Sequence, residues 1–216
     1  MSNVKVRSPR ALARGIGVFL FAAVACTSGP PPPAKSDGHD RATLEIRARK
    51  DAMMRSDPDS PLPAEKRASF AGLPYYDIKP EFHITSFLTV DRTGGPPMII
   101  TLQTSTNVPR KMRRVGALGF TLNQTAYKLT AFADIDDSAM KRLFVPFGDL
   151  TNNTETYGGG RYLDLDRTAS GFYDLDFNRA YHPYCVFNPT YECPVPPREN
   201  RLAVAIPAGE RLGASK

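Results

Sequence analysis

The stretch TETYGGGRYLDLD, residues 154–166, places an acidic and a basic side chain on either side of three consecutive glycines. Glu155 and Arg161 flank the glycines, and Asp149 ends the apolar run LFVPFGDL just before them. Carboxylates, a guanidinium and glycine amides are groups that bind anions or exchange protons. Glu155, Asp149 and Arg161 are therefore the candidate catalytic residues.

The glycine run does not have the context of a nucleotide-binding loop. Such a loop lies between a strand and a helix that begins with Lys followed by Ser or Thr. Here the period-two pattern RYLDLD of a strand follows the glycines. Alternation puts Arg161 on the face of the two leucines and Tyr162 on the opposite face with the two aspartates.

Arg161 thus lies at the edge of an apolar row, where an unpaired guanidinium is costly. Asp149 ends a second apolar row by the same alternation, and Glu155 lies in the connection between the two rows. We expect Arg161 to pair with Asp149 or Glu155 where the strands meet. The pair is either a structural salt bridge that holds a hairpin, which the pattern favours, or the clamp of an anion or polar-ligand site.

A second group with chemical potential lies near the C-terminus, in HPYCVFNPTYEC. If Cys26 is lipidated, Cys185 and Cys193 are an even pair, and a disulfide that closes the short loop is the expected state. Free or reactive thiols are the second interpretation. A metal site that adds His182 is the third, but three ligands without CxxC spacing give little support for it. We expect no metal and no cofactor.

Other motifs of catalysis are not present in the sequence. It contains neither G-x-S-x-G nor H-E-x-x-H. Asp174 and Asp176 alternate with Leu175 and Phe177, so the two carboxylates are expected on a solvated face.

The first 25 residues have the composition of an export signal. Basic residues are followed by GIGVFLFAAVA and then by Cys26, an apolar run shorter than the roughly 20 residues that span a bilayer. Ala23 and Ala25 before the cysteine resemble a bacterial lipobox. That resemblance implies a lipid such as palmitate on Cys26 and anchoring to the cell envelope; Thr27 fits the periplasmic side of the outer membrane in a Gram-negative cell. Secretion without a lipid and an uncleaved membrane anchor are the alternatives.

The positive net charge belongs mainly to this leader. The chain has a formal net charge of +6, and removing the four basic residues of the leader leaves 24 basic against 22 acidic residues. A nucleic-acid partner is therefore not expected.

The remaining chain divides into three parts that must position the candidate residues. Residues 26–39, with PPPP, predict a semi-rigid tether. Residues 40–80 predict a helix, capped by Asp40, and an ordered wrap. Residues 81–212 show period-two patterns, RLAVAI being the last, that predict about eight short antiparallel strands. The fold class is all-β, a sandwich or barrel, with one N-terminal helix packed on it.

Two long segments resemble the family catalogued as domain of unknown function 1684. They are LFVPFGDLTNNTETYGGGRYLDLD and DLDFNRAYHPYCVFNPTYECPVPPRENRLAVAIPAGE, with support from RKD, SPL and FAGLPYY. The family pattern has an asparagine near His182, which weakens a special role for that histidine. The resemblance implies no reaction. It points to its matching positions as the site: Asp149, Glu155, Thr156, Tyr157, Arg161, Tyr162, Asp176, Asn178, Cys185, Cys193, Asn200 and Glu210.

The sequence therefore predicts a membrane-tethered envelope lipoprotein with a binding or structural β-domain. Its expected partners are the membrane, through Cys26, and a small polar or anionic ligand. The alternative is an envelope hydrolase with Glu155 or Asp149 as acid or base and Arg161 as clamp. A metal-binding protein is the second alternative.

Overall fold

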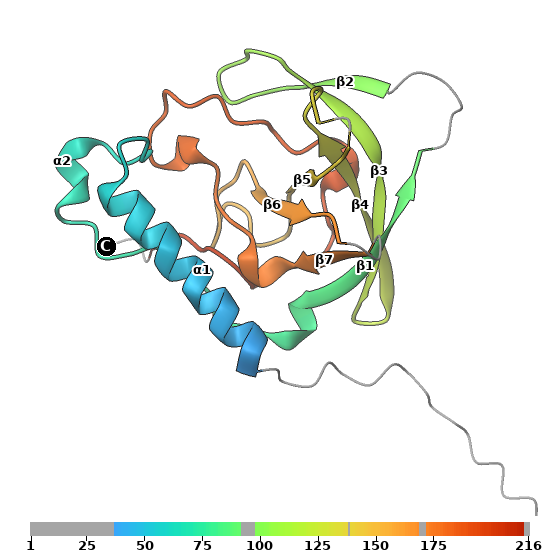
Figure 1. The fold of residues 1–216 in the computed structure, drawn as a ribbon, viewed down its shortest axis with the longest axis horizontal. Helices are drawn as coiled ribbons and strands as arrows, with labels where there is room; N and C mark the ends of the chain where they lie inside the picture. Colours follow the sequence, from blue (N-terminus) through green and yellow to red (C-terminus); the bar gives the residue numbers. More distant parts are fainter. Residues whose placement is uncertain (1–36, 92–97, 138, 169–171, 214–216) are drawn as a thin grey trace, which may run out of the picture. The chain divides into compact units, whose positions relative to one another are not determined.

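The computed structural model describes residues 37–91, 98–137, 139–168 and 172–213 (Figure 1). The predicted signal peptide, Cys26 and most of the predicted tether lie outside these residues. Within the described ranges, no helix is both long enough and apolar enough to cross a membrane.

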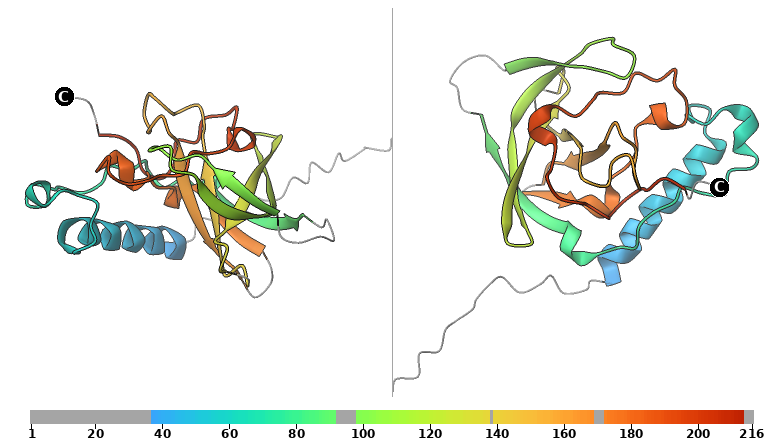
Figure 2. Two further views of the ribbon diagram at one scale, coloured as in Figure 1. Left: turned by 90° about the horizontal axis from the view of Figure 1, so that it is seen from above. Right: turned by 180° about the vertical axis from the view of Figure 1, so that it is seen from behind.

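The described strands form one antiparallel sheet that curves into a nearly closed barrel (Figures 1 and 2). Its order is β6-β5-β4-β3-β1-β7, and β2 pairs with the first half of β3. The all-β prediction with one N-terminal helix is confirmed, and the barrel is the form it takes. The strands are β1 (His83–Val90), β2 (Met98–Leu102), β3 (Arg110–Leu122), β4 (Thr125–Ala133), β5 (Arg142–Phe147), β6 (Arg161–Asp166) and β7 (Phe172–Asp176).

The long strand β3 changes partner at a bulge between Arg114 and Gly116. Before the bulge β3 pairs with β2, and after it with β1. A β-carbon at Gly116 would lie 2.1 Å from the carbonyl oxygen of Thr89, so only glycine permits this approach. The bulge sends β2 away from the barrel wall, where it can cover the outer face of neighbouring strands.

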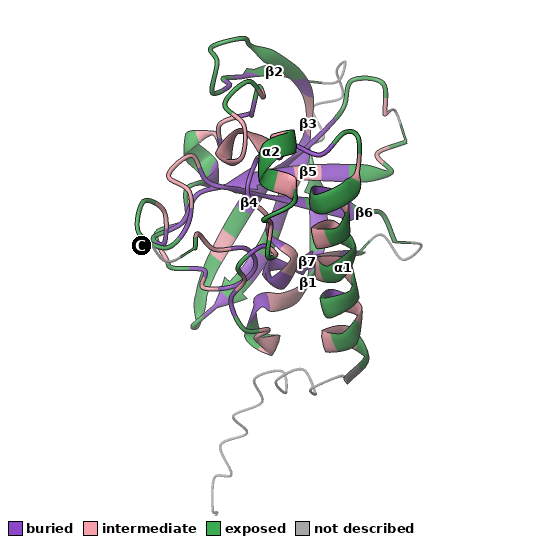
Figure 3. Ribbon diagram, turned by 90° about the vertical axis from the view of Figure 1, so that its left-hand side faces the viewer, coloured by how far each residue is buried: buried purple, intermediate pink, exposed green. Residues whose placement is uncertain are grey.

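The interior follows the predicted alternation. Leu163 and Leu165 of β6 face the same core as Leu143, Val145 and Phe147 of β5, and all five are buried. Burial of such side chains is the main favourable term in folding. Figure 3 shows the buried positions concentrated on the strands, whereas much of the outward side of the helix is exposed.

Helix α1 (Asp37–Ser56) begins before the predicted start at Asp40. His39 in its first turn stacks on His83 of β1, with ring centroids 3.9 Å apart, and its Nε2 lies 2.8 Å from Asp176 Oδ2. Asp176 is consequently only 1% exposed. The expectation of a solvated face for Asp174 and Asp176 is wrong for Asp176, because strand alternation does not show that a helix covers the outer face.

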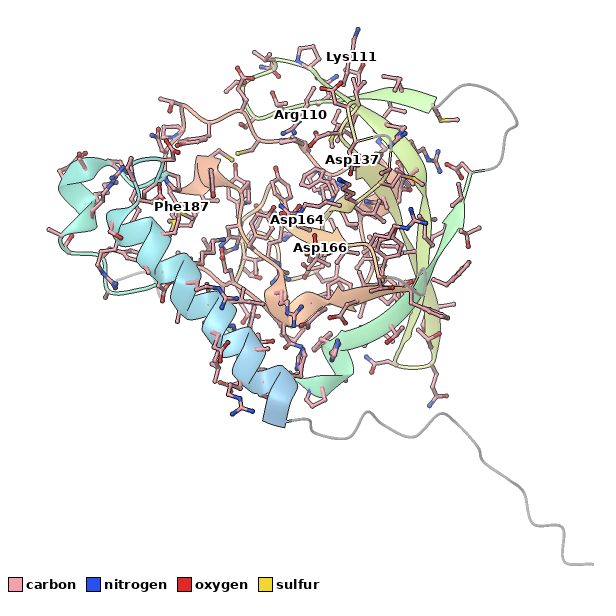
Figure 4. All side chains as sticks on the ribbon, viewed as in Figure 1. Arg110, Lys111, Asp137, Asp164, Asp166 and Phe187 are labelled. Atoms are coloured by element: carbon pink, nitrogen blue, oxygen red, sulfur yellow. The ribbon has the colours of Figure 1, made fainter. Side chains whose placement is uncertain are left out.

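The second half of α1 anchors the wrap that follows it. Met54 packs with Leu62 and Leu73, and Phe187 (labelled in Figure 4) packs against the same cluster. Asp51 accepts the Leu73 N–H at 3.0 Å. The wrap therefore joins the helix to the C-terminal half of the chain.

The predicted last strand, RLAVAI, is wrong. Arg201 makes one isolated bridge with Gly148, and the chain then continues without a ladder to Glu210. Ile206, the last residue of this stretch, has its carbonyl hydrogen-bonded to a side chain instead of to a strand, and the carbonyls of Ala208 and Glu210 beyond it bond to the same side chain.

Candidate functional site

Arg161 is completely buried, and both of its terminal nitrogens are occupied. Nη2 donates to Asp149 Oδ2 at 2.8 Å and to the Ile206 carbonyl at 2.7 Å. Nη1 donates to the carbonyls of Ala208 and Glu210, the latter at 3.2 Å. The predicted pairing of Arg161 with Asp149 is confirmed, and Arg161 has no terminal N–H left for a ligand.

Asp149 is equally occupied. Its Oδ1 accepts the N–H of Thr151 at 2.8 Å, the hydroxyl of Thr151 at 2.6 Å and the N–H of Ile206 at 3.2 Å. Glu155 is exposed, on the surface of the connection between β5 and β6. The three candidate catalytic residues therefore do not converge on a cleft: two are locked in the core and the third faces solvent.

The glycine run is a tight turn that brings β6 back beside β5. Gly160 has φ +89°, and a β-carbon there would lie 2.5 Å from the Phe147 carbonyl oxygen. The Gly160 N–H closes this turn on the Tyr157 carbonyl at 3.0 Å. Thr156 holds the turn before it, with its Oγ1 2.8 Å from Thr151 Oγ1 and 2.9 Å from Asn152 Nδ2. Thr156 is thus structural.

Asn178 and Asn200 are buried clamps between chain segments. Asn178 exchanges two hydrogen bonds of 2.9 Å with the backbone of Lys79. Asn200 bonds the N–H and carbonyl of Thr130 at 2.7 and 2.8 Å and the Pro146 carbonyl at 2.7 Å, which ties β4 to β5. Both side chains are fully buried and both N–H groups of each amide are occupied, so neither side chain is available to a ligand.

Glu210 and His182 form a second buried polar group. Glu210 accepts the Lys50 ammonium at 2.5 Å and the His182 N–H at 2.8 Å, and burial raises the pKa of its carboxyl group against the effect of Lys50. His182 Nε2 accepts the Tyr157 N–H at 3.2 Å. Burial, assisted by the charges of Arg161 and Lys50, lowers the pKa of His182 to about 3.

The predicted disulfide is wrong: Cys185 and Cys193 both carry free thiols. The Cys185 N–H donates to Cys193 Sγ at 3.0 Å. Backbone bonds from Asn188 to Tyr184 and from Tyr191 to Asn188 already close the loop between them, so no covalent bond is needed to hold it. His182 uses its Nε2 for Tyr157, and among the described residues no three His, Cys, Asp or Glu side chains are arranged to hold a metal.

The outer face of β5 and β6 carries a cleft of about 740 Å³. Its walls come from α1, from the start of β3 with the β4–β5 connection, and from residues 181–194. Figure 4 shows three of its lining residues, Arg110, Asp137 and Asp164, around the middle of the view. The volume of this cleft and its mixture of apolar and polar side chains are typical of sites that bind small molecules.

Four tyrosines and a phenylalanine line this cleft: Tyr162, Tyr181, Tyr184, Tyr191 and Phe144. Tyr162 packs edge-on against Phe144 at 4.8 Å and against Tyr181 at 5.7 Å, and Tyr184 against Tyr191 at 5.4 Å. The Tyr162 hydroxyl donates to the Pro194 carbonyl at 2.5 Å. The rings are therefore fixed in place and offer rigid apolar contact area.

Asp164 is one of four carboxylates that line the cleft, with Asp134, Asp137 and Glu192. It is exposed, and the Tyr181 hydroxyl donates to its Oδ2 at 2.9 Å. Burial raises the pKa of Asp164, although the Tyr181 hydrogen bond and Arg142 act in the opposite direction.

Of the residues predicted for the site, Tyr162 and Cys193 line the cleft. The others lie in the core, at the surface or beside the cleft. Sequence reasoning missed Asp164, Tyr181, Tyr184 and Tyr191 as site residues. Two signals could have indicated them: the shared outward face of Tyr162 and Asp164 in RYLDLD, and the density of tyrosine in AYHPYCVFNPTY.

Replacing Arg161 by methionine should destabilise the domain by about 3–5 kcal/mol, because Asp149 would remain as a buried, unpaired carboxylate. Arg142→Met is the matched control, since Arg142 pairs with Asp166 at the surface, 3.3 Å apart, and should cost less than about 1 kcal/mol. Urea denaturation of both variants measures the difference. Equal losses would contradict a special role for the buried pair.

Replacing His182 by asparagine should flatten the dependence of stability on pH. The unfolded histidine binds a proton near its ordinary pKa of 6.5, whereas the folded one does so only near 3. Wild-type stability should therefore fall as pH drops through this window, by up to about 3 kcal/mol at pH ~4. Urea denaturation from pH ~4 to ~7 should show a smaller loss for H182N.

His83→Asn is the control of opposite sign. The hydrogen bond that His83 donates to Asp174 raises the pKa of His83 against burial, so His83 stabilises the fold below its unfolded pKa and loses this effect as pH rises through the folded one. H83N should thus be weakest relative to wild type at acidic pH. If the free energy of unfolding changed with pH in the same way for wild type, H182N and H83N, the roles given to both histidines would be refuted.

This architecture is shared with a solved structure. The solution NMR structure of an uncharacterized protein from Haloarcula marismortui superposes with a TM-score of 0.63 at 33% sequence identity, over 83% of this chain and 97% of that one. No curated protein matches the chain. The family model "Protein of unknown function (DUF1684)" matches residues 68–211, which contain the Arg161 pair and most of the cleft. The chain belongs to this family, as its two long motifs predicted.

Proposed function

We propose that the protein is a lipid-anchored envelope protein whose barrel binds a small uncharged polar ligand in the tyrosine-lined cleft. The observation that carries this proposal is the cleft of about 740 Å³ with four tyrosines around Asp164. Rigid aromatic rings provide apolar contact, and a few polar groups, here the carboxyl group of Asp164 beside Tyr181, orient a polar ligand.

The charges of the cleft favour an uncharged ligand over an anionic one. The four basic residues of the lining all have carboxylate partners: Arg110 with Asp134 at 3.0 Å, Arg142 with Asp166 at 3.3 Å, Lys50 with Glu210 at 2.5 Å and Arg49 with Glu45 at 3.9 Å. An anion would have to compete with these carboxylates for each cation. Saccharides fit best as a class, because they combine an apolar ring face with hydroxyl groups that can bond to Asp164.

A hydrolase is the second candidate, and one observation favours it. Burial raises the pKa of Asp164, whereas hydrogen bonds from the backbone of Arg142 and Lys141 lower the pKa of Asp137, which also lines the cleft. Two carboxyl groups in unlike environments are the arrangement of many glycoside hydrolases. The version with Asp149, Glu155 and Arg161 has no support from the geometry, because those groups do not meet at a cleft.

Asp164→Ala should weaken saccharide binding about tenfold, since one hydrogen bond to a carboxyl group is worth about 1.5 kcal/mol. Asp166→Asn is the control, because Asp166 is exposed and does not line the cleft. The affinity of this variant for the saccharide should match that of wild type. The chain has no tryptophan, so quenching of tyrosine fluorescence reports ligands in the cleft.

The probes are neutral oligosaccharides and their sulfated counterparts, added to the full chain. Tighter binding of the sulfated series, or an unchanged affinity of D164A for the neutral one, would contradict the proposed ligand class. Release of reducing ends by wild type but not by D164A would establish the hydrolase instead.

Cys26→Ala should abolish the lipid anchor. Metabolic labelling with radioactive palmitate should mark the wild-type chain and the Cys185→Ser control, but not C26A, because only the proposed lipobox cysteine would receive the lipid. Fractionation should then move C26A out of the membrane fraction. Label on C26A, or an unlabelled wild type, would disprove lipidation at this position.

A further inference from the structure

Strand β2 is an edge strand of the sheet. Among the described residues it pairs only with β3, and it lies at the top of Figure 1. The unpaired N–H and C=O groups of an edge can bind another chain, so natural sheets often place charges or prolines in the edge strand. The strand MIITL contains neither, and its first two residues, Met98 and Ile99, are exposed. Pro96 and Pro97 precede the strand in the sequence and do not interrupt it.

The chain just beyond β2 already has a neighbour on this edge. The Val195 N–H donates to the Gln103 carbonyl at 2.7 Å. The Ser105 N–H donates to the Cys193 carbonyl at 2.9 Å. Thr104, between the two β2-side residues, instead turns its carbonyl to an N–H inside the β2–β3 turn. Because successive residues of a strand direct their backbone groups to opposite edges, Gln103 and Ser105 point away from β3.

The same alternation directs the N–H and C=O groups of Thr101 and Ile99 to the edge that Gln103 uses. If the neighbouring segment kept its register, Pro197 would lie opposite Thr101, but proline has no N–H to donate. The segment turns there into the 3₁₀ helix Arg198–Asn200. Within the part of the chain that the structure describes, Thr101 and Ile99 therefore have no strand on this side.

Two cations of β3 lie beside this edge. Lys111, labelled in Figure 4, is opposite Thr101, and Arg113 is opposite Ile99. Each therefore shares a face of the sheet with the β2 residue opposite it. Neither cation forms an ion pair with a carboxylate of the described residues. An added strand would lie two strand spacings, roughly 10 Å, from β3, a distance that a lysine or arginine and a glutamate side chain span together.

We propose that the free edge of β2 docks an extended acidic segment of a partner protein, which adds a strand along Ile99 and Thr101. Main-chain hydrogen bonds to the edge provide affinity, and Lys111 and Arg113 select acidic side chains. A second copy of this chain fits less well, because its own β2 edge would bring the same two cations to the interface. This edge is separate from the proposed ligand cleft, because none of these four residues lines the cleft.

Fluorescence anisotropy with labelled peptides and the full chain tests the docking. The probe is a short peptide of alternating glutamate and valine. It is compared with a peptide of alternating lysine and valine, and with the acidic peptide N-methylated along its central amides. Only the unmethylated acidic peptide should bind, because methylation removes the N–H donors of an added strand but keeps the charge. Equal affinity for the methylated peptide, a preference for the basic one, or no binding of the acidic probe would each overturn the proposal.

Ile99→Pro blocks the edge in the protein itself. Proline removes an N–H that points away from β3, so the ladder with β3 is retained and peptide binding should be lost. Ile99→Thr is the matched control and should bind as wild type does, since threonine keeps the N–H. Lys111→Gln should weaken binding of the acidic peptide about threefold, as expected for one exposed ion pair.

If I99P is folded by circular dichroism and binds the acidic peptide as tightly as wild type, the peptide does not occupy this edge. If I99P is unfolded, the comparison of methylated and unmethylated peptides on the wild-type chain decides. Sedimentation of the peptide-free chain identifies the other occupant: a wild-type dimer that I99P dissociates would assign the edge to a second copy and overturn the proposal.

Discussion

The ion pair between Arg161 and Asp149 is the interaction on which the rest of the domain depends. A guanidinium and a carboxylate removed from water lose several kcal/mol of solvation each, and their mutual attraction offsets this only with the help of further hydrogen bonds. Here these bonds come mainly from the backbone: the carbonyls of three residues in the C-terminal segment and the amides of Thr151 and Ile206. Only the buried Nε of Arg161 has no hydrogen-bond partner within this pair and its cage. The segment after Leu202 therefore has the path that its carbonyls require, not that of a strand.

The side chains of strand β6 point alternately into the core and toward the cleft. Its inward positions hold Arg161 and the two leucines, which fix the barrel, and its outward positions present Tyr162 and Asp164 to the cleft. The same short strand thus anchors the core and supports the proposed site. Because Arg161 is immobilised on one side, the tyrosine and the aspartate on the other side are held by a rigid backbone, which favours selective binding.

Much of the fold could be predicted from the sequence, because period-two patterns and turn residues are local signals. The pairing of Arg161 with Asp149 could also be predicted, since a charge at the end of an apolar row needs a partner nearby. The burial of Asp176 under α1 could not, because no pattern in β7 records what covers it. The disulfide prediction failed because it rested on the number of cysteines and on the expected export. Neither of these records the local hydrogen bonds of the two cysteines. The cleft was missed because its walls come from segments more than a hundred residues apart, such as Lys50 and Tyr184.

The carbonyls that surround Arg161 belong to residues that follow it in the chain by 45, 47 and 49 positions. During synthesis these residues therefore emerge well after strand β6. Until then Arg161 has no backbone cage, and closing the barrel would bury a charge without its hydrogen-bond partners. The last step of barrel closure must consequently wait for the segment that supplies these three carbonyls.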